Sequence, residues 1–311
     1  MTTALLYHPI YLKHDTGSHH PERASRLQSI LRKLQKTGLI NKLKFIQPDA
    51  ASIEDIALVH PRSYVLGINE TCKKGGFNLD PDTVVSINSF EAALFAVGAV
   101  IKGIDLIFKG DLDNAFCMVR PPGHHARPSQ AMGFCLFNNI AIGARYIQKR
   151  HKLRRILIID WDVHHGNGTE EVFYEEADVF YISLHQYPHY PGTGSGESTG
   201  KGKAKGFNLN VPMQAGSSDS DHIKAFHEII MPRVEDFKPE FVLISAGFDG
   251  HKDDPLSSLN LTEQGYYEMT NILKDIAARY SKNRILSVLE GGYNLFALAN
   301  STHSHLEALL A

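Results

Sequence analysis

Residues Arg155–Gly168 read RILIIDWDVHHGNG, an apolar run that leads directly into Asp160, Asp162 and His164. Such a run predicts a buried strand that ends in a polar cluster. Side chains two apart on a strand point the same way, so two carboxylates and an imidazole are expected to crowd together. Because like charges so close are costly without a cation or proton, the segment indicates a divalent metal site. The plainer alternative is helix capping, but the Asp-x-Asp-x-His pattern exceeds what a cap needs.

Similar short runs rich in β-branched residues recur and end at Gly, Pro or Asp. With Arg155–Ile159, the predicted strands are Ala115–Val119, Val179–Leu184, Phe241–Ala246 and Ile285–Leu289. The predicted helices, with apolar spacings of three and four, are Arg26–Leu34, Phe90–Ile107, Phe137–Gln148, Asp221–Val234 and Thr262–Tyr280. This alternation predicts a parallel sheet covered by helices on both faces. No repeat or linker divides the chain, so residues 1–311 are expected to form a single domain.

Composition narrows the possible functions. Lys+Arg 32 against Asp+Glu 34 give a formal charge of −2, so we expect no direct nucleic-acid binding and no membrane association. The cysteines Cys72, Cys117 and Cys135 are too far apart to indicate a disulfide framework or a thiolate zinc site, which favours a cytoplasmic location. No apolar run approaches the roughly 20 residues that span a bilayer. The glycine-rich stretch Pro191–Gly206 is expected to be a flexible loop, because the phosphate-binding pattern GxxxxGK[ST] matches nowhere.

A second polar cluster follows the strand Phe241–Ala246, in the sequence GFDGH. A parallel neighbour would bring Asp249 beside the first cluster, although an Asp before Gly is more often a turn residue. Asp162, His164 and Asp249 would then supply three ligands and leave a position open for water or substrate, as in catalytic zinc sites. The oxygen-rich set also suits Fe²⁺ or Co²⁺.

Two more strands lead to candidate catalytic groups. Ala115–Val119 is followed by RPPGHH, where His124 and His125 could act as acid and base, or form a surface pair or ligands of another metal. Ile285–Leu289 is followed by EGGYN, which places Tyr293 at the same edge, where it could equally be a packing residue. All these groups follow the carboxyl ends of strands, where parallel sheets hold their ligands.

Taken together, these motifs resemble those of the histone deacetylase family. They are, in order, HHPERASRL, RPPGHH, GFCLFNN, IDWDVHHGNG, SLHQYPHYPGTG, SAGFDGH and EGGYN, and the resemblance as a whole extends from about His8 to Asn294. The resemblance implies a three-layer α/β/α arginase–deacetylase fold with a central parallel sheet of about eight strands. It also implies a zinc-dependent amidohydrolase that removes acetyl groups from amines such as the side chain of acetyl-lysine.

The resemblance also implies roles for single residues. Asp162, His164 and Asp249 are the expected zinc ligands, in agreement with the choice from the residues alone, and the Tyr293 hydroxyl is expected to bind the substrate carbonyl. Attack by an activated water would place negative charge on that carbonyl oxygen, and a histidine would protonate the departing amine.

The family pairs its two motif histidines with polar side chains. Here His124 would pair with Asp160, and His125 with Asn167, an Asn typical of the class II branch. We favour His125 as the main proton carrier, and the division of acid and base roles stays open.

The resemblance further implies a narrow substrate channel and a structural potassium ion. The channel positions are Gly133, Phe134, Tyr190 and Leu256. The potassium would be held mostly by backbone carbonyls of Asp160, Asp162, His164, Ser183 and Leu184. Polyamine-selective relatives carry Glu after the Asp-Pro of the ligand loop, whereas this chain has Leu256, which favours an acetyl-lysine peptide over an acetylated polyamine.

Three alternatives stay open. The chain could hydrolyse small acetylated amines or longer acyl-lysines, or it could be a non-catalytic metal-binding reader or scaffold of acyl-lysine. A two-metal ureohydrolase would need more ligands than the sequence offers. Retention of Tyr293 and both motif histidines argues against the non-catalytic alternative. The oligomeric state is not indicated by any pattern.

Overall fold

The computed structural model describes residues 1–311 and contains a sheet of eight strands in the order β2-β1-β5-β10-β9-β6-β7-β8. All neighbouring strands of this sheet are parallel. The strands are β1 Thr3–Leu6, β2 Lys44–Ile46, β5 Asn114–Cys117, β6 Ile156–Asp160, β7 Val179–Gln186, β8 Asn208–Met213, β9 Phe241–Ala246 and β10 Ile285–Leu289. A separate antiparallel hairpin consists of β3 Phe77–Asn78 and β4 Val84–Val85. The expected parallel sheet of about eight strands is confirmed.

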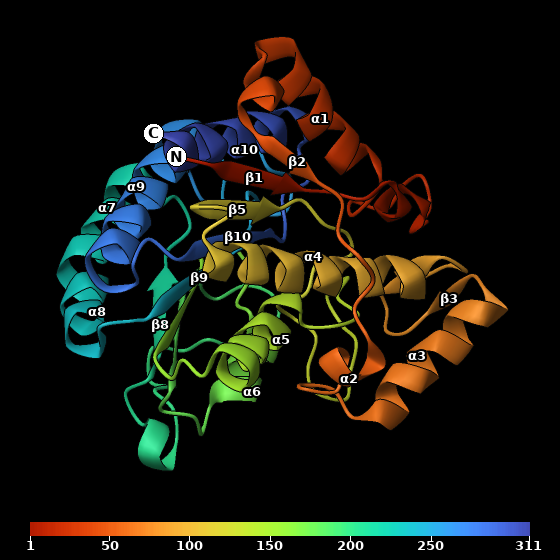
Figure 1. Ribbon diagram of the computed structural model, residues 1–311, viewed down its shortest axis with the longest axis horizontal. Helices are drawn as coiled ribbons and strands as arrows, with labels where there is room; N and C mark the ends of the chain where they lie inside the picture. The colour runs from red at the N-terminus through yellow and green to blue at the C-terminus, as the bar shows by residue number, and fades with distance from the viewer.

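Helices cover both faces of this sheet and complete the three layers (Figure 1). The helices α4, α5 and α6 pack on one face, whereas α9 and α10 pack on the other, with α1 packed against α10 and α7 against α9. Their bounds are α1 Ser25–Thr37, α2 Ile53–Ile56, α3 Arg62–Lys74, α4 Ser89–Lys109, α5 Asn139–Tyr146, α6 Asn167–Phe173, α7 Asp219–Ala225, α8 Met231–Phe237, α9 Glu263–Tyr280 and α10 Leu295–Leu310. The two chain ends meet, because the Thr3 hydroxyl donates to the Leu309 carbonyl. No helix combines the length and apolar character needed to cross a membrane.

The central strands are apolar throughout because both of their faces are covered. Every residue of β6, β9 and β10 is buried, as expected for parallel strands between two helical layers. The helix after β10 begins immediately beyond the EGGYN motif. The Asn294 side chain accepts hydrogen bonds from the N–H groups of Phe296 and Ala297, and so caps α10 one residue after Tyr293.

The strand order places four chain segments side by side at the centre of the sheet. The strands β5, β10, β9 and β6 are consecutive in the sheet although they are not consecutive in the chain. In the pairing register, Asp160 lies opposite Ser245, and Leu289 lies opposite Ala246. The loops that follow these strands therefore start at the same level of one sheet edge, as expected from the sequence.

Two expectations about connections need refinement. The glycine-rich stretch is a loop between β7 and β8 with one 3₁₀ turn, Gly202–Ala204, and the carbonyl of Gly194 faces Nε2 of His185 at 2.9 Å. Part of the loop is therefore held against the sheet, and its flexibility stays a prediction. The helix predicted over Asp221–Val234 is divided, because a π-helical turn, Phe226–Ile230, separates α7 from α8.

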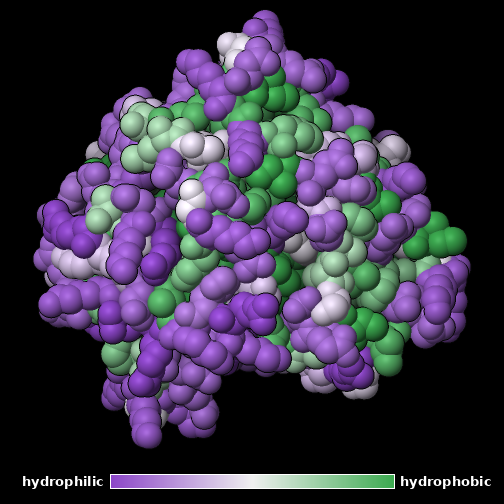
Figure 2. All heavy atoms as spheres, viewed as in Figure 1, coloured by the Kyte–Doolittle hydropathy of each residue, from purple (hydrophilic) through white to green (hydrophobic).

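The face shown in Figure 2 is largely polar, with an apolar group at the edge where α3 and β3 lie. Large hydrophobic residues exposed on these two elements are Leu66 and Phe77. The hairpin that begins with Phe77 extends toward the sheet edge at which the candidate active site lies, since Pro81, Asp82 and Val84 line its cavity.

Candidate active site

Asp162, His164 and Asp249 converge at the carboxyl ends of the adjacent strands β6 and β9. Each offers one ligand atom, and these atoms all lie within 4.8 Å of one another. Nδ1 of His164 is 3.1 Å from Oδ1 of Asp162 and 3.2 Å from Oδ2 of Asp249. All three residues are buried. The structure thus brings together the three residues expected as metal ligands.

The charges of this group favour a bound cation. Burial and the neighbouring Asp162 carboxylate raise the pKa of Asp249 to about 7. Burial lowers the pKa of His164, but the two carboxylates outweigh burial and raise it to about 10. Oδ2 of Asp249 is buried and accepts no hydrogen bond, although it lies 3.2 Å from Nδ1 of His164, and such an atom is costly. Two carboxylates and one imidazole are a donor set that zinc accepts, so these residues fit a divalent metal ion.

Gly291 of the EGGYN motif makes this arrangement possible. A Cβ atom at this position would lie 2.0 Å from Oδ2 of Asp249 and 2.5 Å from Oδ2 of Asp162. The Gly291 N–H instead donates to Oδ2 of Asp162 at 2.7 Å. The sequence suggested only a turn here, whereas the structure shows that the glycine lets two carboxylates approach the backbone.

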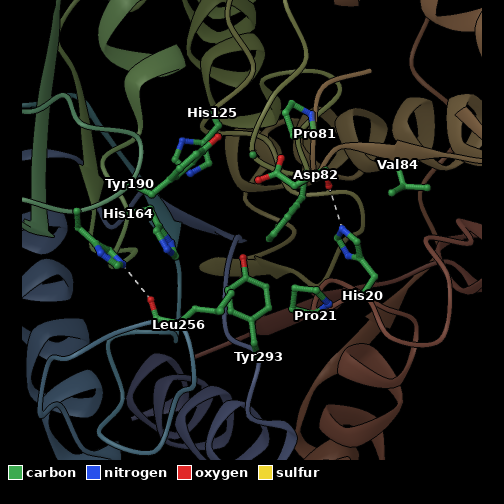
Figure 3. Close-up of a pocket in the computed structure, with 13 residues that line it drawn as sticks. His20, Pro21, Pro81, Asp82, Val84, His125, His164, Tyr190, Leu256 and Tyr293 are labelled. Carbon is green, nitrogen blue, oxygen red and sulfur yellow. Dashed lines mark hydrogen bonds between the residues drawn. The ribbon is translucent and has the colours of Figure 1, made fainter. Parts of the chain in front are cut away.

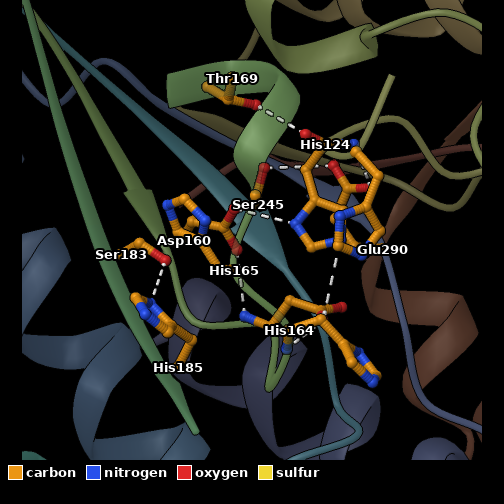
Figure 4. A network of polar contacts seen from close by, with 12 residues as sticks. His124, Asp160, His164, His165, Thr169, Ser183, His185, Ser245 and Glu290 are labelled. Carbon is orange, nitrogen blue, oxygen red and sulfur yellow. Dashed lines mark hydrogen bonds and ion pairs between the residues drawn. The ribbon is translucent and has the colours of Figure 1, made fainter. Parts of the chain in front are cut away.

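Asp160 lies outside the metal-ligand group, although the sequence pattern placed it with Asp162 and His164 on one face of a strand. The strand β6 ends at Asp160, so the alternation expected of a strand does not extend to Asp162 or His164. Asp160 Oδ2 lies 2.9 Å from Nδ1 of His124 and also accepts the Tyr181 hydroxyl (Figure 4). The expected pairing of His124 with Asp160 is therefore present, while Asp162 lies 3.8 Å from Nε2 of the same ring and belongs to the ligand group with Asp249.

The two motif histidines have opposite electrostatic environments. Burial lowers the pKa of His124, but Asp160 and Asp162 outweigh burial and raise it to about 10. Burial and the neighbouring imidazoles of His124 and His164 hold the pKa of His125 well below its ordinary value. His124 is thus favoured as an imidazolium, and His125 as a neutral imidazole.

His125 has the hydrogen-bond arrangement of a base. Its Nδ1 lies 2.8 Å from Oδ1 of Asn167, whose amide nitrogen faces Sδ of Met132. An amide oxygen only accepts, so Nδ1 carries the proton and Nε2 is left as the acceptor. Gly133 packs against the ring: it has φ +56°, and a Cβ atom there would lie 2.4 Å from Cδ2 of His125.

Tyr293 is held at the pocket by its backbone and its ring. Its N–H donates to Oδ2 of Asp254 at 2.6 Å, while the Arg26 guanidinium lies 5.1 Å from the ring centroid and Phe134 packs edge-on at 5.8 Å. Burial raises the pKa of Tyr293 well above its ordinary value. The phenol therefore stays protonated and can donate a hydrogen bond.

Two residues of the early HHPERASRL motif, Glu22 and Arg26, hold this turn through buried hydrogen bonds. Glu22 accepts hydrogen bonds from the guanidinium groups of both Arg26 and Arg120, and all three residues are fully buried. Arg26 also donates to the carbonyls of Glu290 and Gly292 at 2.5 and 2.6 Å. The early motif thus fixes the backbone that leads to Tyr293.

A cavity of about 430 Å³ opens onto these groups (Figure 3). It is lined by His20, Pro21, Pro81, Asp82, Val84, His125, Gly133, Phe134, His164, His189, Tyr190, Leu256 and Tyr293. All four expected channel residues are among them. His189, which stacks on His164 at 5.0 Å, and the hairpin residue Asp82 were not singled out from the sequence. The hairpin is too short for periodicity to reveal, so no sequence pattern placed Asp82 here.

The residues expected around potassium are also brought together. Asp160 lies opposite Ser183 in the register of β6 and β7, and Leu184 follows on β7. Asp162 and His164 follow β6 directly, and all five residues are buried. Potassium binding itself stays a prediction.

Comparisons with known proteins agree with this geometry. The histone deacetylase domain matches residues 20–309. A probable deacetylase of Archaeoglobus fulgidus is 41% identical over 313 residues, covering 100% of this chain and 87% of the relative. A histone deacetylase-like amidohydrolase of Pseudomonas aeruginosa is 38% identical over 277 residues, covering 88% of this chain and 72% of the relative. The crystal structure of the HDA15 HD domain matches with a TM-score of 0.95 and 36% identity, covering 99% of this chain and 88% of that one.

Proposed function

Because this chain belongs to the histone deacetylase family, we propose that it hydrolyses the amide bond of acetyl-lysine in proteins or peptides with the help of a zinc ion. The observation that carries this proposal is the meeting of three elements at one cavity: the Asp162, His164 and Asp249 group, the neutral His125, and the protonated Tyr293. A non-catalytic reader would not need the last two.

The cavity walls fit an aliphatic stem with a polar end. The rings of Phe134 and Tyr190 belong to the lining, and Tyr190 packs edge-on against His125 with centroids 5.2 Å apart. Such walls bury the methylene groups of a lysine side chain, and the polar groups at the bottom orient its amide. The half-exposed Tyr190 marks the mouth, whereas His125 and His164 lie deep.

The protein groups then divide the reaction among them. A divalent ion held by Asp162, His164 and Asp249 would polarise the acetyl carbonyl and acidify a water molecule. Nε2 of His125 accepts the proton of that water, because its Nδ1 is committed to Asn167. The Tyr293 hydroxyl donates to the carbonyl oxygen as negative charge develops there.

The second half of the reaction needs an acid. The departing amine takes a proton from a motif histidine, for which His125, protonated in the first step, is the main candidate. His124 is held by Asp160 and stabilises the developing negative charge as an imidazolium. Iron or cobalt could replace zinc in this ligand set, and we propose potassium as a structural ion beneath it.

One residue at the cavity mouth is compatible with a second substrate class, the acetylated polyamines. Leu256 brings no charge to the mouth, but Asp82 lines the cavity there. Burial and the neighbouring Asp80 raise the pKa of Asp82 to about 6. This carboxylate can accept hydrogen bonds from a peptide backbone or from a second ammonium group, so Leu256 alone does not disfavour acetylated polyamines.

The first experiment is therefore acetate release from an acetyl-lysine peptide and from acetylated polyamines, with zinc-loaded and chelator-treated protein. Metal-dependent release from the peptide supports the proposal. Faster release from polyamines, lost in Asp82→Asn, would replace acetyl-lysine by the second class. No release from either, with one metal ion bound per chain, would overturn the deacetylase proposal and favour a longer acyl group or a reader.

A further inference from the structure

The side chain of Glu290 joins three segments of the site (Figure 4). Oε2 accepts the N–H groups of Gly123 at 2.7 Å and His124 at 3.2 Å, and Oε1 accepts the Ser245 hydroxyl at 3.1 Å. Glu290 follows β10, whereas Gly123 lies 167 residues earlier in the chain, in the loop after β5. One carboxylate thus connects the segment that carries the motif histidines to the segment that carries Tyr293.

The sequence of the histidine loop explains why such a partner is needed. The loop leaves β5 through Arg120, Pro121 and Pro122, and the two prolines have no N–H to donate. Gly123 and His124 provide the next two amide donors. They lie beyond the end of β5 in the buried interior, where an unpaired N–H is costly, and Glu290 accepts both.

The backbone around Glu290 is also held by hydrogen bonds. Its carbonyl accepts from Arg26 at 2.5 Å, and the next residue, Gly291, donates to Asp162. The turn from Glu290 to Tyr293 is therefore hydrogen-bonded through its backbone, and the carboxylate extends this fixed turn to the histidine loop. Glu290 therefore connects the motif histidines to Tyr293, the groups that must act on the same substrate carbonyl.

Burying a carboxylate at this position is costly in free energy. Glu290 is fully buried, and its hydrogen-bond donors are all neutral, with no Lys or Arg paired to the carboxylate. Burial raises its pKa to about 7, while the nearby charges are His124, which lowers the pKa, and Asp160 and Asp162, which raise it. A costly buried group beside a reaction centre is more common where geometry serves function than in an ordinary core.

We infer that Glu290 is a positioning residue that fixes His124 and His125 relative to Tyr293. This inference rests on the proposed deacetylase function. Without the carboxylate, the Gly123 and His124 amides lose their direct link to the tyrosine turn, and a displacement of about 1 Å at a reaction centre can cost roughly 10²-fold in rate. Binding of the substrate stem should change little, because Glu290 is not among the residues that line the cavity.

Three variants separate positioning from general structure. Glu290→Gln keeps one oxygen for the two N–H groups and places its amide toward the Ser245 hydroxyl, which can accept. Glu290→Asp keeps the charge but is one methylene too short. Ser287→Ala is the matched control, because Ser287 lies on β10 three residues before Glu290 and contacts His305 in the core at 2.8 Å, away from the cavity.

The measurements are kcat and KM with the acetyl-lysine peptide, zinc content, and hydrogen exchange of the Gly123 and His124 amides. We expect Glu290→Gln to stay within about tenfold of wild-type kcat, and Glu290→Asp to lose about 10²-fold in kcat with KM and zinc content retained and faster exchange of both amides. Ser287→Ala should lose thermal stability and keep kcat.

Wild-type kcat and unchanged amide exchange in folded Glu290→Asp would overturn the inference. Equal losses of kcat in all three variants would also overturn it, because they would show only a general structural effect. If wild-type protein releases no acetate from any substrate, the proposed function fails, and the exchange of the two amides still tests the connection itself.

Discussion

Replacing Tyr293 with phenylalanine should remove a single hydroxyl group and little else. The backbone N–H that binds Asp254 is unchanged, and the contacts of the ring with Arg26 and Phe134 remain available to phenylalanine. The hydroxyl is protonated at neutral pH, since burial raises its pKa. Loss of one such donor to a developing oxyanion costs about 10²–10³ in kcat, or roughly 3–4 kcal/mol. We therefore expect kcat to fall by this factor at nearly constant KM and full zinc content.

The assay is acetate release from an acetyl-lysine peptide with metal content measured on the same samples. Tyr190→Phe is the matched control, because it removes a phenol from the mouth of the same cavity and should change kcat only a few-fold. Wild-type turnover in zinc-loaded Tyr293→Phe would refute the role of the hydroxyl. An equal loss in both variants would show that the channel, not the hydroxyl, limits the rate.

Three further outcomes are expected. Asp249→Ala should lose its zinc after dialysis, as measured by elemental analysis, and a fully loaded variant would remove Asp249 from the ligand set. Asn167→Asp places a carboxylate beside His125 and should raise the pKa of His125. Because the neutral imidazole is the base, the acidic limb of the pH profile of kcat/KM should move to higher pH. An unchanged limb would contradict the role of His125 as the base. Glu22→Ala leaves two buried guanidinium groups without their shared carboxylate and should cost about 3–5 kcal/mol in the free energy of unfolding by urea, and a loss below about 1 kcal/mol would show that the cluster relaxes.

The central strands were predictable because burial on both faces leaves an unmistakable pattern. The strands β9 and β10 match their predicted bounds, and β6 differs by one residue at each end. By contrast, β1 and β2 have only a few residues each, and β8 alternates asparagine with apolar residues, so neither length nor composition distinguished them. The helix α10 carries serine, threonine and histidine that are buried by tertiary contacts, which weakens its apolar pattern.

The sequence predicted those site residues that directly follow a strand with a clear apolar pattern. Asp162 and Asp249 follow β6 and β9, and parallel strand ends meet at one edge, so their convergence could be inferred. Asp82 could not be found in this way, because its position depends on a two-residue hairpin strand. The sequence identified Glu290 only as part of a turn. Its contact with the Gly123 N–H, 167 residues earlier in the chain, depends on the strand order.

That strand order also explains how the site is held rigid. Hydrogen bonds join the loops at this sheet edge in pairs. The Glu290 carboxylate joins the loop after β10 to the loop after β5, and the Gly291 N–H joins the loop after β10 to Asp162 after β6. The Val163 N–H joins the loop after β6 to Asp249 after β9. Each joining residue lies within three positions of a fully buried strand. Sites supported by regular elements keep their geometry better than sites on free loops. The chemistry therefore depends on contacts among four chain segments that no local sequence pattern contains.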